Sequence, residues 1–280
     1  PELAYEEVQT AALVAEKLAQ WGWQVTRGVG QTGVVGTLKL GTGTRSIGIR
    51  ADMDALPIIE QTGLPYASGT HGKMHACGHD GHTAILLAAA KHLAQEKNFD
   101  GTLNLIFQPA EEGQAGAKKM LEDGLFDKFP CDAVFAMHNM PGFPTGKFGF
   151  LPGSFMASSD TVIITVTGRG GHGAVPHKAV DPVVVCAQIV LALQSIVSRI
   201  VAPLDMAIIT VGAIHAGEAP NVIPETAEMR LSVRALRPEV RDLLQERITA
   251  VACGQAASAM RLRSTRQSTT ACWNDAARSG

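Results

Sequence analysis

Residues 45–54 read R-S-I-G-I-R-A-D-M-D, a short apolar run that leads directly into Asp52 and Asp54. Two later apolar runs end in the same way, 102–107 before Glu111 and Glu112, and 133–137 before His138. Helical periodicity over 83–95 and 115–122 separates these runs. The alternation predicts an α/β fold with a mostly parallel sheet, right-handed crossovers and helices on both faces. Open α/β sheets carry their sites outside the carboxyl ends of their strands, so these polar residues should meet there.

The remainder of the first half fits the same domain. A helix is expected over 6–20, and strands over 33–40 and 45–51 with Gly41-Thr42-Gly43 as a hairpin turn between them. The stretch 141–153 holds three prolines and four glycines, which indicates a domain boundary. We therefore predict the N-terminal part of a catalytic metal-binding domain over residues 1–152.

A second, smaller domain is expected over residues 153–260. Its pattern predicts three strands and two helices, in the order 161–167, helix 182–199, 206–214, 225–235 and helix 238–252. This order describes a two-layer α/β sandwich, one strand short of a ferredoxin-like unit. The tail 261–280 holds four arginines and shows no closing strand, so we expect it to be disordered. We interpret it as an altered reading frame or a fragment boundary.

Composition excludes several classes of protein. The chain has 280 residues, 46% of them hydrophobic, and a formal charge of −2, so nothing predicts binding to nucleic acid or to an anionic membrane. No apolar run reaches the roughly 18 residues that span a bilayer, since Gln188, Gln194 and Ser195 interrupt the nearest candidate. Five scattered cysteines do not form a disulfide framework. We expect a reducing, cytoplasmic location, where free thiols persist.

Cys77-Gly78-His79 is the sharpest metal signal, because glycine lets two ligands that are two residues apart converge on one ion. The alternative is a buried cysteine beside a surface histidine. Glu112 and His138, at the ends of neighbouring strands, favour the metal interpretation. Thiolate, imidazole and carboxylate together suit zinc or a related first-row divalent ion.

Glu111 and Glu112 form the second signal. Adjacent buried carboxylates repel each other unless cations or protons intervene, so one could bind metal while the other acts as general base toward water. The alternative is a solvated pair before a helix. For Asp52 and Asp54 we favour supporting roles, such as accepting the second N–H of a ligating histidine, over direct ligation. Nearby His82 is expected to have a structural role.

Residues 168–177 read G-R-G-G-H-G-A-V-P-H and lack the P-loop pattern, which makes phosphate binding a weak interpretation. His172 stands where glycines let the backbone approach a ligand, and it could donate to an oxyanion. Thiol-protease chemistry is disfavoured, because Cys77 and His79 are too close along one loop for a nucleophile and its base. No G-x-S-x-G elbow occurs.

At these residues the chain resembles the M20 metallopeptidase family, in its aminoacylase and hippurate hydrolase branch. Six stretches carry the resemblance, in family order over roughly residues 1–255: R-A-D-M-D-A-L-P-I, M-H-A-C-G-H-D-G-H-T-A, Q-P-A-E-E-G, A-M-H-N-M-P-G, G-R-G-G-H-G-A-V-P-H and N-V-I-P-E-T-A-E-M-R-L-S-V-R. The resemblance implies a catalytic domain with a paired-metal site and a smaller lid domain used in homodimerisation. It further implies hydrolysis of the amide bond of N-acyl amino acids, with two divalent ions whose identity stays open among zinc, manganese, cobalt and nickel.

The resemblance also implies roles for individual residues. The implied metal ligands are Cys77, His79, Glu112 and His138. The implied general base is Glu111, and His172 is implied to stabilise the transition state from a partner subunit. Asn221 and Arg230 fall in the lid segment that helps to hold substrate. Because nothing after Ala252 matches the family's return to the catalytic domain, the alternative is an inactive fragment that keeps partial metal binding and lid-mediated association.

Overall fold

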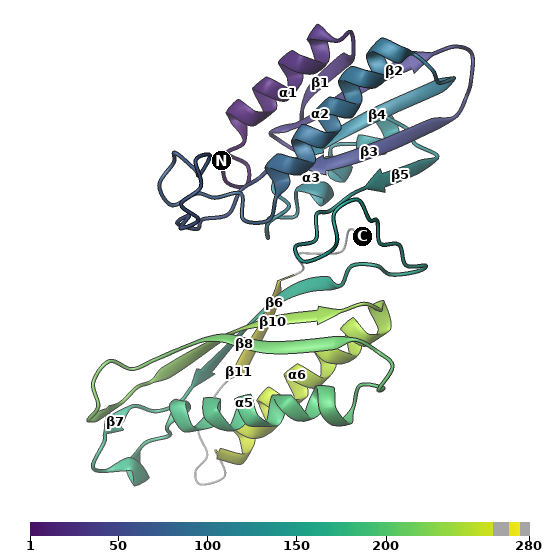
Figure 1. The fold of residues 1–280 in the computed structure, drawn as a ribbon. Coiled ribbons are helices and arrows are strands. Elements are labelled where there is room, and N and C mark those ends of the chain that lie inside the picture. The colour runs from purple at the N-terminus through teal and green to yellow at the C-terminus, as the bar shows by residue number, and fades with distance from the viewer. Residues whose placement is uncertain (260–268, 275–280) are drawn as a thin grey trace. The chain divides into compact units, whose positions relative to one another are not determined.

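The computed structural model describes residues 1–259 and 269–274, and these form two compact units. The first is Pro1–Lys147 and the second begins at Phe148, within the stretch rich in proline and glycine. Figure 1 shows a central sheet in each unit, with helices packed against it.

The first unit combines a five-stranded sheet with four helices. In chain order its elements are α1 (Val8–Gln20), β1 (Gln24–Val29), β2 (Gly33–Leu40), β3 (Ser46–Asp52), α2 (His79–Glu96), β4 (Gly101–Gln108), α3 (Gly116–Glu122), α4 (Leu125–Lys128) and β5 (Ala133–Ala136). The strands lie in the order β1-β2-β4-β3-β5. The predicted α/β class is confirmed, and the first-turn residues His79 and His82 belong to α2 rather than to a preceding loop.

The sheet is mixed, which corrects the expectation of a mostly parallel one. β3 pairs in parallel with β4 and β5, whereas β1-β2 and β2-β4 are antiparallel. The expected hairpin across Gly41-Thr42-Gly43 is also wrong, because β4 lies between β2 and β3. Residues 104–108 of β4 are all buried, and a central strand needs neighbours on both sides to pair its backbone. Gly43 N instead donates to Asp100 Oδ1 at 2.6 Å.

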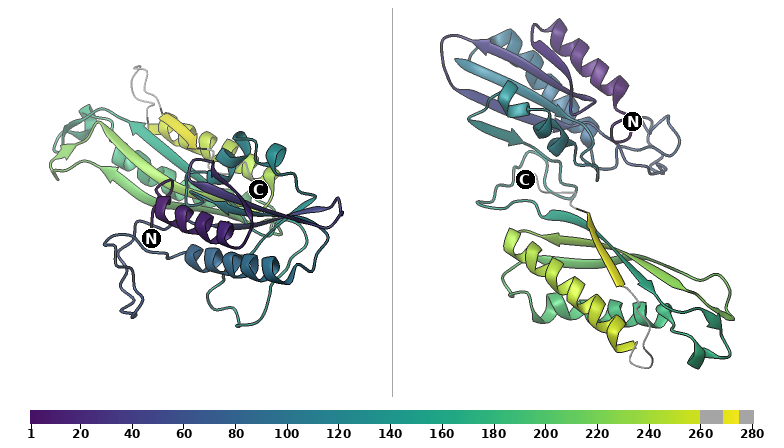
Figure 2. Two further views of the ribbon diagram at one scale, coloured as in Figure 1. Left: turned by 90° about the horizontal axis from the view of Figure 1, so that it is seen from above. Right: turned by 180° about the vertical axis from the view of Figure 1, so that it is seen from behind.

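Helices cover both faces of this sheet, as predicted. Leu105 and Phe107 of β4 face α1 and α2, where they join a buried cluster with Leu18 and Leu86. Ile106 points to the other face and packs with a second cluster that includes Met120 of α3. Successive side chains of a strand point to opposite faces, so one apolar strand supplies both cores. Figure 2 shows the helices on the two sides of the sheet.

The second unit is a two-layer sandwich. Its elements are β6 (Ser158–Thr167), β7 (Gly171–His172), the 3₁₀ turn η1 (Pro176–Lys178), α5 (Pro182–Arg199), β8 (Ala207–Ala216), β9 (Val222–Ile223), β10 (Thr226–Ala235), α6 (Pro238–Ala259) and β11 (Thr269–Asn274). The main sheet has the order β11-β6-β10-β8 with every pairing antiparallel. This is the complete ferredoxin-like order.

β11 corrects the prediction that the tail 261–280 has no closing strand. Thr269–Asn274 pairs antiparallel with β6, from Thr269 opposite Val166 to Asn274 opposite Thr161. Without β11, β6 would be an edge strand with unpaired backbone groups, and the threonines and tryptophan of β11 are residue types favoured in strands. The other tail residues, 261–268 and 275–280, lie outside the described part of the chain.

One apolar core holds the second unit together. β10 alternates strictly, with Met229, Leu231 and Val233 buried and Arg230 and Arg234 exposed. The buried side packs on α5 and α6. α5 begins after Asp181, whose side chain accepts a hydrogen bond from Val183 N at 2.9 Å. By length and composition alone α5 could span a membrane, but its inner face belongs to this core, as in the core helix of a folded domain.

Candidate metal centre

The three parallel neighbours β4, β3 and β5 carry the predicted site residues just beyond their carboxyl ends. β3 ends at Asp52, β4 is followed by Glu111 and Glu112, and β5 is followed by His138. Parallel strands end at the same edge of a sheet, so these segments meet, and the first turn of α2 joins them. The residues that the sequence predicts to meet at this edge of the sheet therefore do lie close together there.

His79 lies at the centre of this group. Its side chain is fully buried, and neither ring nitrogen has a hydrogen-bond partner within the described residues. Its Nε2 lies 4.0 Å from Glu111 Oε2, 4.0 Å from Glu112 Oε1 and 3.7 Å from Asp52 Oδ2. Leaving a buried polar atom without a partner is costly, so a ligand that is absent from the polypeptide is expected at this nitrogen.

Three overlapping groups of side chains could hold a metal ion, and His79 belongs to all of them. In each group one ligand atom per residue lies within 4.8 Å of the others: Cys77–His79–His138, His79–Glu111–Glu112 and Asp52–His79–His82. The four predicted ligands all fall within the first two groups. The chemistry of these donors, a thiol, imidazoles and carboxylates, fits a borderline divalent ion.

The third group is better explained as a support. His82 Nδ1 lies 2.6 Å from Asp52 Oδ1, and its Nε2 accepts a hydrogen bond from Asn139 N at 3.0 Å. Both ring nitrogens are thus engaged by the protein, which agrees with the structural role predicted for His82. Because Asn139 follows His138, this contact also fixes the loop that presents His138.

His138 itself is held in one tautomer. Its Nδ1 lies 2.7 Å from the carbonyl oxygen of Asn139, which can only accept, so Nδ1 carries the proton. Nε2 therefore keeps its lone pair, and it faces Cys77 Sγ at 3.5 Å. The exposed His138 ring thus presents Nε2 as a possible ligand atom, beside a second possible one, Cys77 Sγ.

Asp54 supports two parts of the site at once. Its Oδ1 lies 3.4 Å from His79 Nδ1, and its two carboxylate oxygens accept from Glu111 N and Glu112 N, each at 2.9 Å. The sequence predicts a supporting role for Asp54, and its two amide hydrogen bonds hold the loop that carries Glu111 and Glu112. Asp52 is engaged by His82 and by Arg50 Nη1, the latter at 2.8 Å.

Cations would offset the negative charge that gathers at the site, where the carboxylates of Glu111 and Glu112 lie near the Cys77 thiol. Burial, followed by the nearby carboxylates of Glu112 and Glu111, raises the pKa of the Cys77 thiol to about 12. Desolvation and the neighbouring Glu112 carboxylate likewise raise the pKa of Glu111. Burial would lower the pKa of His79, but Asp54 and Asp52 outweigh it and raise that pKa. Bound cations would favour the thiolate and both carboxylates, so the residues present fit a metal site.

Glycine is required between Cys77 and His79. Gly78 has φ +86° and is the N-terminal cap of α2, and a Cβ atom there would lie 2.5 Å from Asn139 Oδ1. A side chain at this position would therefore have to displace the Asn139 side chain, and its backbone would be strained at this positive φ.

The remaining predicted residues lie in the second unit. His172 in β7 and Asn221 are brought together, since Gly173 N donates to Asn221 O at 2.8 Å and β7 pairs with β9. His172 Nδ1 accepts from Ala174 N at 3.1 Å, which leaves Nε2–H as a donor on an exposed ring. Arg230 lies on the exposed face of β10, and its Nε donates to Glu228 Oε1 at 2.8 Å.

Sequence reasoning missed Glu7, Arg50 and Asn139, all of which contact the site segments. Nothing in the expected helix 6–20 singles out Glu7, yet its side chain is fully buried. The only signal that could have found Asn139 is its place directly after His138. No spacing in the sequence connects Glu7 with residue 110, 103 positions away.

Comparisons with known proteins agree with this geometry. The sequence profile of Peptidase family M20/M25/M40 matches residues 48–276. Hippurate hydrolase of Campylobacter jejuni is 54% identical over 254 residues, which are 91% of this chain and 66% of that protein. N-acetyl-L-cysteine deacetylase of Bacillus subtilis is 45% identical over 252 residues, 90% of this chain and 60% of that protein. The chain thus spans less than two thirds of the length of both relatives.

Among solved structures, a dinuclear metal-binding peptidase of the M20 family from Bacillus subtilis superposes with a TM-score of 0.77 at 37% sequence identity. The superposition covers 98% of this chain and 69% of that one. The matched profile extends over most of the sequence, and the relatives share close to half of their aligned residues with it. The chain belongs to the peptidase family M20/M25/M40.

Proposed function

We propose that this chain is a metal-dependent hydrolase that cleaves the amide bond of N-acyl amino acids. The observation that carries the proposal is the buried His79, which makes no side-chain hydrogen bond within the described residues and belongs to two groups of possible ligand atoms that lie within 4.8 Å of one another: Cys77–His79–His138 and His79–Glu111–Glu112. The activities by which the two relatives are named, hydrolysis of hippurate and deacetylation of N-acetyl-L-cysteine, are of this reaction class. They do not favour an inactive fragment as the alternative.

The proposed ligands of two divalent ions are Cys77, His79, Glu112 and His138. We keep zinc, manganese, cobalt and nickel as candidates, because donor chemistry does not separate them. When bound, such ions polarise a carbonyl oxygen and lower the pKa of water. Asp54 orients His79 and the backbone amides of Glu111 and Glu112. Asp52 contacts His82, which in turn holds the loop of His138.

Glu111 is the proposed general base. Its side chain keeps 42% of its surface exposed, so it can reach a water molecule, whereas the Glu112 side chain keeps only 26%. The pKa of Glu111 is raised toward neutral pH. This suits a group that takes a proton from the attacking water and returns it to the leaving nitrogen.

We further propose that the second unit serves substrate binding and assembly. The Nε2–H donor of His172 could stabilise an oxyanion, with Asn221 and Arg230 holding substrate. A homodimer through this unit is supported by two observations. β8 is an edge strand among the described residues, and the outer face of α5 exposes Val184 and Leu191, the latter by 76%. We also propose a cytoplasmic location, where the Cys77 thiol would stay reduced.

The test is a hydrolysis assay on the metal-free chain and on the chain supplied with each candidate ion. Release of free amino acid from N-benzoylglycine or N-acetyl amino acids should appear only with metal. Glu111→Gln should bind the same metal and lose roughly 100- to 10,000-fold in kcat. If the wild-type chain binds metal but releases no amino acid, or if Glu111→Gln turns over normally, the proposal is wrong.

A further inference from the structure

The loop between β4 and α3, which carries Glu111 and Glu112, is held by carboxylates that accept hydrogen bonds from its backbone amides. Asp54 accepts from the amides of residues 111 and 112. The preceding amide, Ala110 N, donates to Glu7 Oε1 at 2.8 Å. Three successive amides of the loop are therefore fixed by acidic side chains from two distant segments.

Glu7 is an unusual residue to find in this position. Its side chain is fully buried, and its other oxygen, Oε2, accepts from Thr32 Oγ1 at 2.5 Å. Both oxygens of this buried carboxylate are hydrogen-bonded, which offsets the cost of burying it, and they tie the start of α1 to the loop that carries Glu111.

The backbone that Glu7 holds is strained. Ala110 has φ +49°, a left-handed conformation that is unfavourable for alanine. Two hydrogen bonds close this turn, from Ala110 N to Glu7 and from Gly116 N to Ala110 O at 2.9 Å. Strained residues near active sites persist only when the surrounding structure holds them, so loss of the Glu7 contact should let residue 110 relax.

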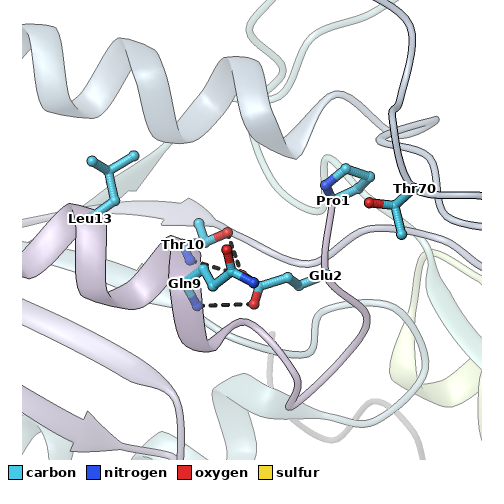
Figure 3. Close-up of a pocket in the computed structure, with 6 residues that line it drawn as sticks. All are labelled: Pro1, Glu2, Gln9, Thr10, Leu13 and Thr70. Carbon is cyan, nitrogen blue, oxygen red and sulfur yellow. Dashed lines mark hydrogen bonds between the residues drawn. The ribbon is translucent and has the colours of Figure 1, made fainter.

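The N-terminal segment around Glu7 is anchored at several other points. Figure 3 shows Glu2, whose carboxylate accepts from Gln9 N and from both Thr10 N and Thr10 Oγ1, at 2.8–2.9 Å. Glu2 O accepts from Ala55 N, next to Asp54, and Tyr5 Oη donates to Gln114 O at 3.0 Å. The segment 2–7 thus touches both loops that carry acidic site residues.

We propose that Glu7 is a positioning residue: through Ala110 it fixes the backbone that aims Glu111 and Glu112 into the site. The inference rests on the proposed function for the role of Glu111 as a base. The contact itself, and its effect on the geometry of the loop, can be measured without any activity.

The experiment compares Glu7→Ala, Glu7→Gln and Thr32→Val with Glu6→Ala in the full chain. Glu6 is the matched control, because it is the adjacent glutamate but is exposed and pairs only with Lys73 among the described residues. Three quantities are measured: amide hydrogen exchange of the peptide over 108–116, affinity for added Zn²⁺, and kcat and KM for an N-acyl amino acid.

In Glu7→Ala, exchange over 108–116 should rise while exchange in the second unit stays unchanged. Zn²⁺ affinity and kcat should each fall about 10- to 100-fold with little change in KM, as for other residues that orient metal ligands. Glu7→Gln keeps a carbonyl oxygen for Ala110 N and should recover most of the loss. Thr32→Val should show a smaller effect in the same direction, and Glu6→Ala should behave as wild type.

Unchanged exchange and Zn²⁺ affinity in Glu7→Ala would overturn the proposal, as would a Glu7→Gln variant no better than alanine. If Glu7→Ala does not fold, Thr32→Val and Glu7→Gln decide the question by the same three measurements. A wild-type chain without hydrolysis would refute the proposed function alone, since hydrogen exchange and Zn²⁺ affinity would still judge the positioning role.

Discussion

The two units of this protein differ in how many polar side chains they bury. Of the nine polar or charged residues that are buried in the described structure, eight lie in the first unit and only Asp160 lies in the second. The second unit has one continuous apolar core between its sheet and two helices. In the first unit the apolar core is divided between the two faces of the sheet. The first unit thus buries polar side chains, several of them at the candidate site, whereas the second buries almost none.

The difference shows in how polar groups are satisfied. Asp160 of the second unit meets Arg241 in a two-point contact, with Nε to Oδ2 at 2.8 Å. Neither ring nitrogen of His79, in the first unit, makes a hydrogen bond within the described residues, and the nearest carboxylate oxygen to its Nδ1 is Asp54 Oδ1 at 3.4 Å. Natural proteins tend to break such rules at functional sites, and His79 lies among the candidate metal ligands.

The largest expected effect is on the stability of the second unit. Arg241→Met should leave the Asp160 carboxylate buried without its charge partner and destabilise this unit by about 3–5 kcal/mol. Hydrogen exchange resolved by peptide would show faster exchange over β6, β10 and α6, with the first unit unchanged. The double variant Arg241→Met with Asp160→Leu should recover most of the loss. Equal destabilisation of single and double variants would contradict this account.

The next effect concerns metal binding in the first unit. His79→Ala removes the side chain that all three candidate groups share, so affinity for Zn²⁺ should fall by more than about 100-fold, which exceeds the loss typical of a merely supporting residue. Calorimetric titration measures this change. His215→Ala, in the second unit, is the control and should bind Zn²⁺ as wild type does. Undiminished binding by His79→Ala would place the metal elsewhere.

A smaller effect is the pH dependence of stability. Burial would raise the pKa of Asp52, but the hydrogen bond from His82 and the charge of Arg50 lower it to about 2 from an ordinary 3.8. Because the folded pKa is the lower one, the stabilisation is fully present above about pH 4 and is lost as pH falls toward 2. It amounts to about 2 kcal/mol. Urea unfolding of the metal-free chain should show this loss, and Asp52→Asn should abolish it.

The smallest effect is expected at the surface of the first unit. Lys73 Nζ lies 2.7 Å from Glu6 Oε2, but 59% of the Glu6 side chain is exposed. Lys73→Ala should therefore change the free energy of unfolding by less than about 1 kcal/mol, and the change should shrink in high salt. If Lys73→Ala lowered the free energy of unfolding as much as Arg241→Met, the exposure of an ion pair would not explain how much each pair contributes to stability.

Much of the architecture could be predicted, because apolar periodicity is a local property. The strand of Asp52, the helices 182–199 and 238–252 and the position of the site at the strand ends all follow from such patterns. The order of strands does not: β4 separates β2 from β3 through contacts far apart in sequence, and no local signal showed this. β11 was missed because its short stretch has no visible period.

The candidate site divides in the same way. Residues with metal-binding side chains, such as Cys77 and His138, could be identified from type and spacing. Glu7 and Asn139 could not, since their importance lies in a hydrogen bond to a backbone amide or to an imidazole, and many acids and amides of the chain look alike in sequence. Supporting contacts require coordinates.

The most direct test of the central claim is titration of the metal-free chain with Co²⁺, followed by optical absorption. A cysteine binds metal as its thiolate. With Cys77 as the proposed ligand, the wild-type chain should develop a thiolate-to-cobalt charge-transfer band that saturates with binding. Cys77→Ser should bind Co²⁺ without that band. Saturable binding by the wild type with no thiolate band, or an equal band in Cys77→Ser, would contradict the proposed centre.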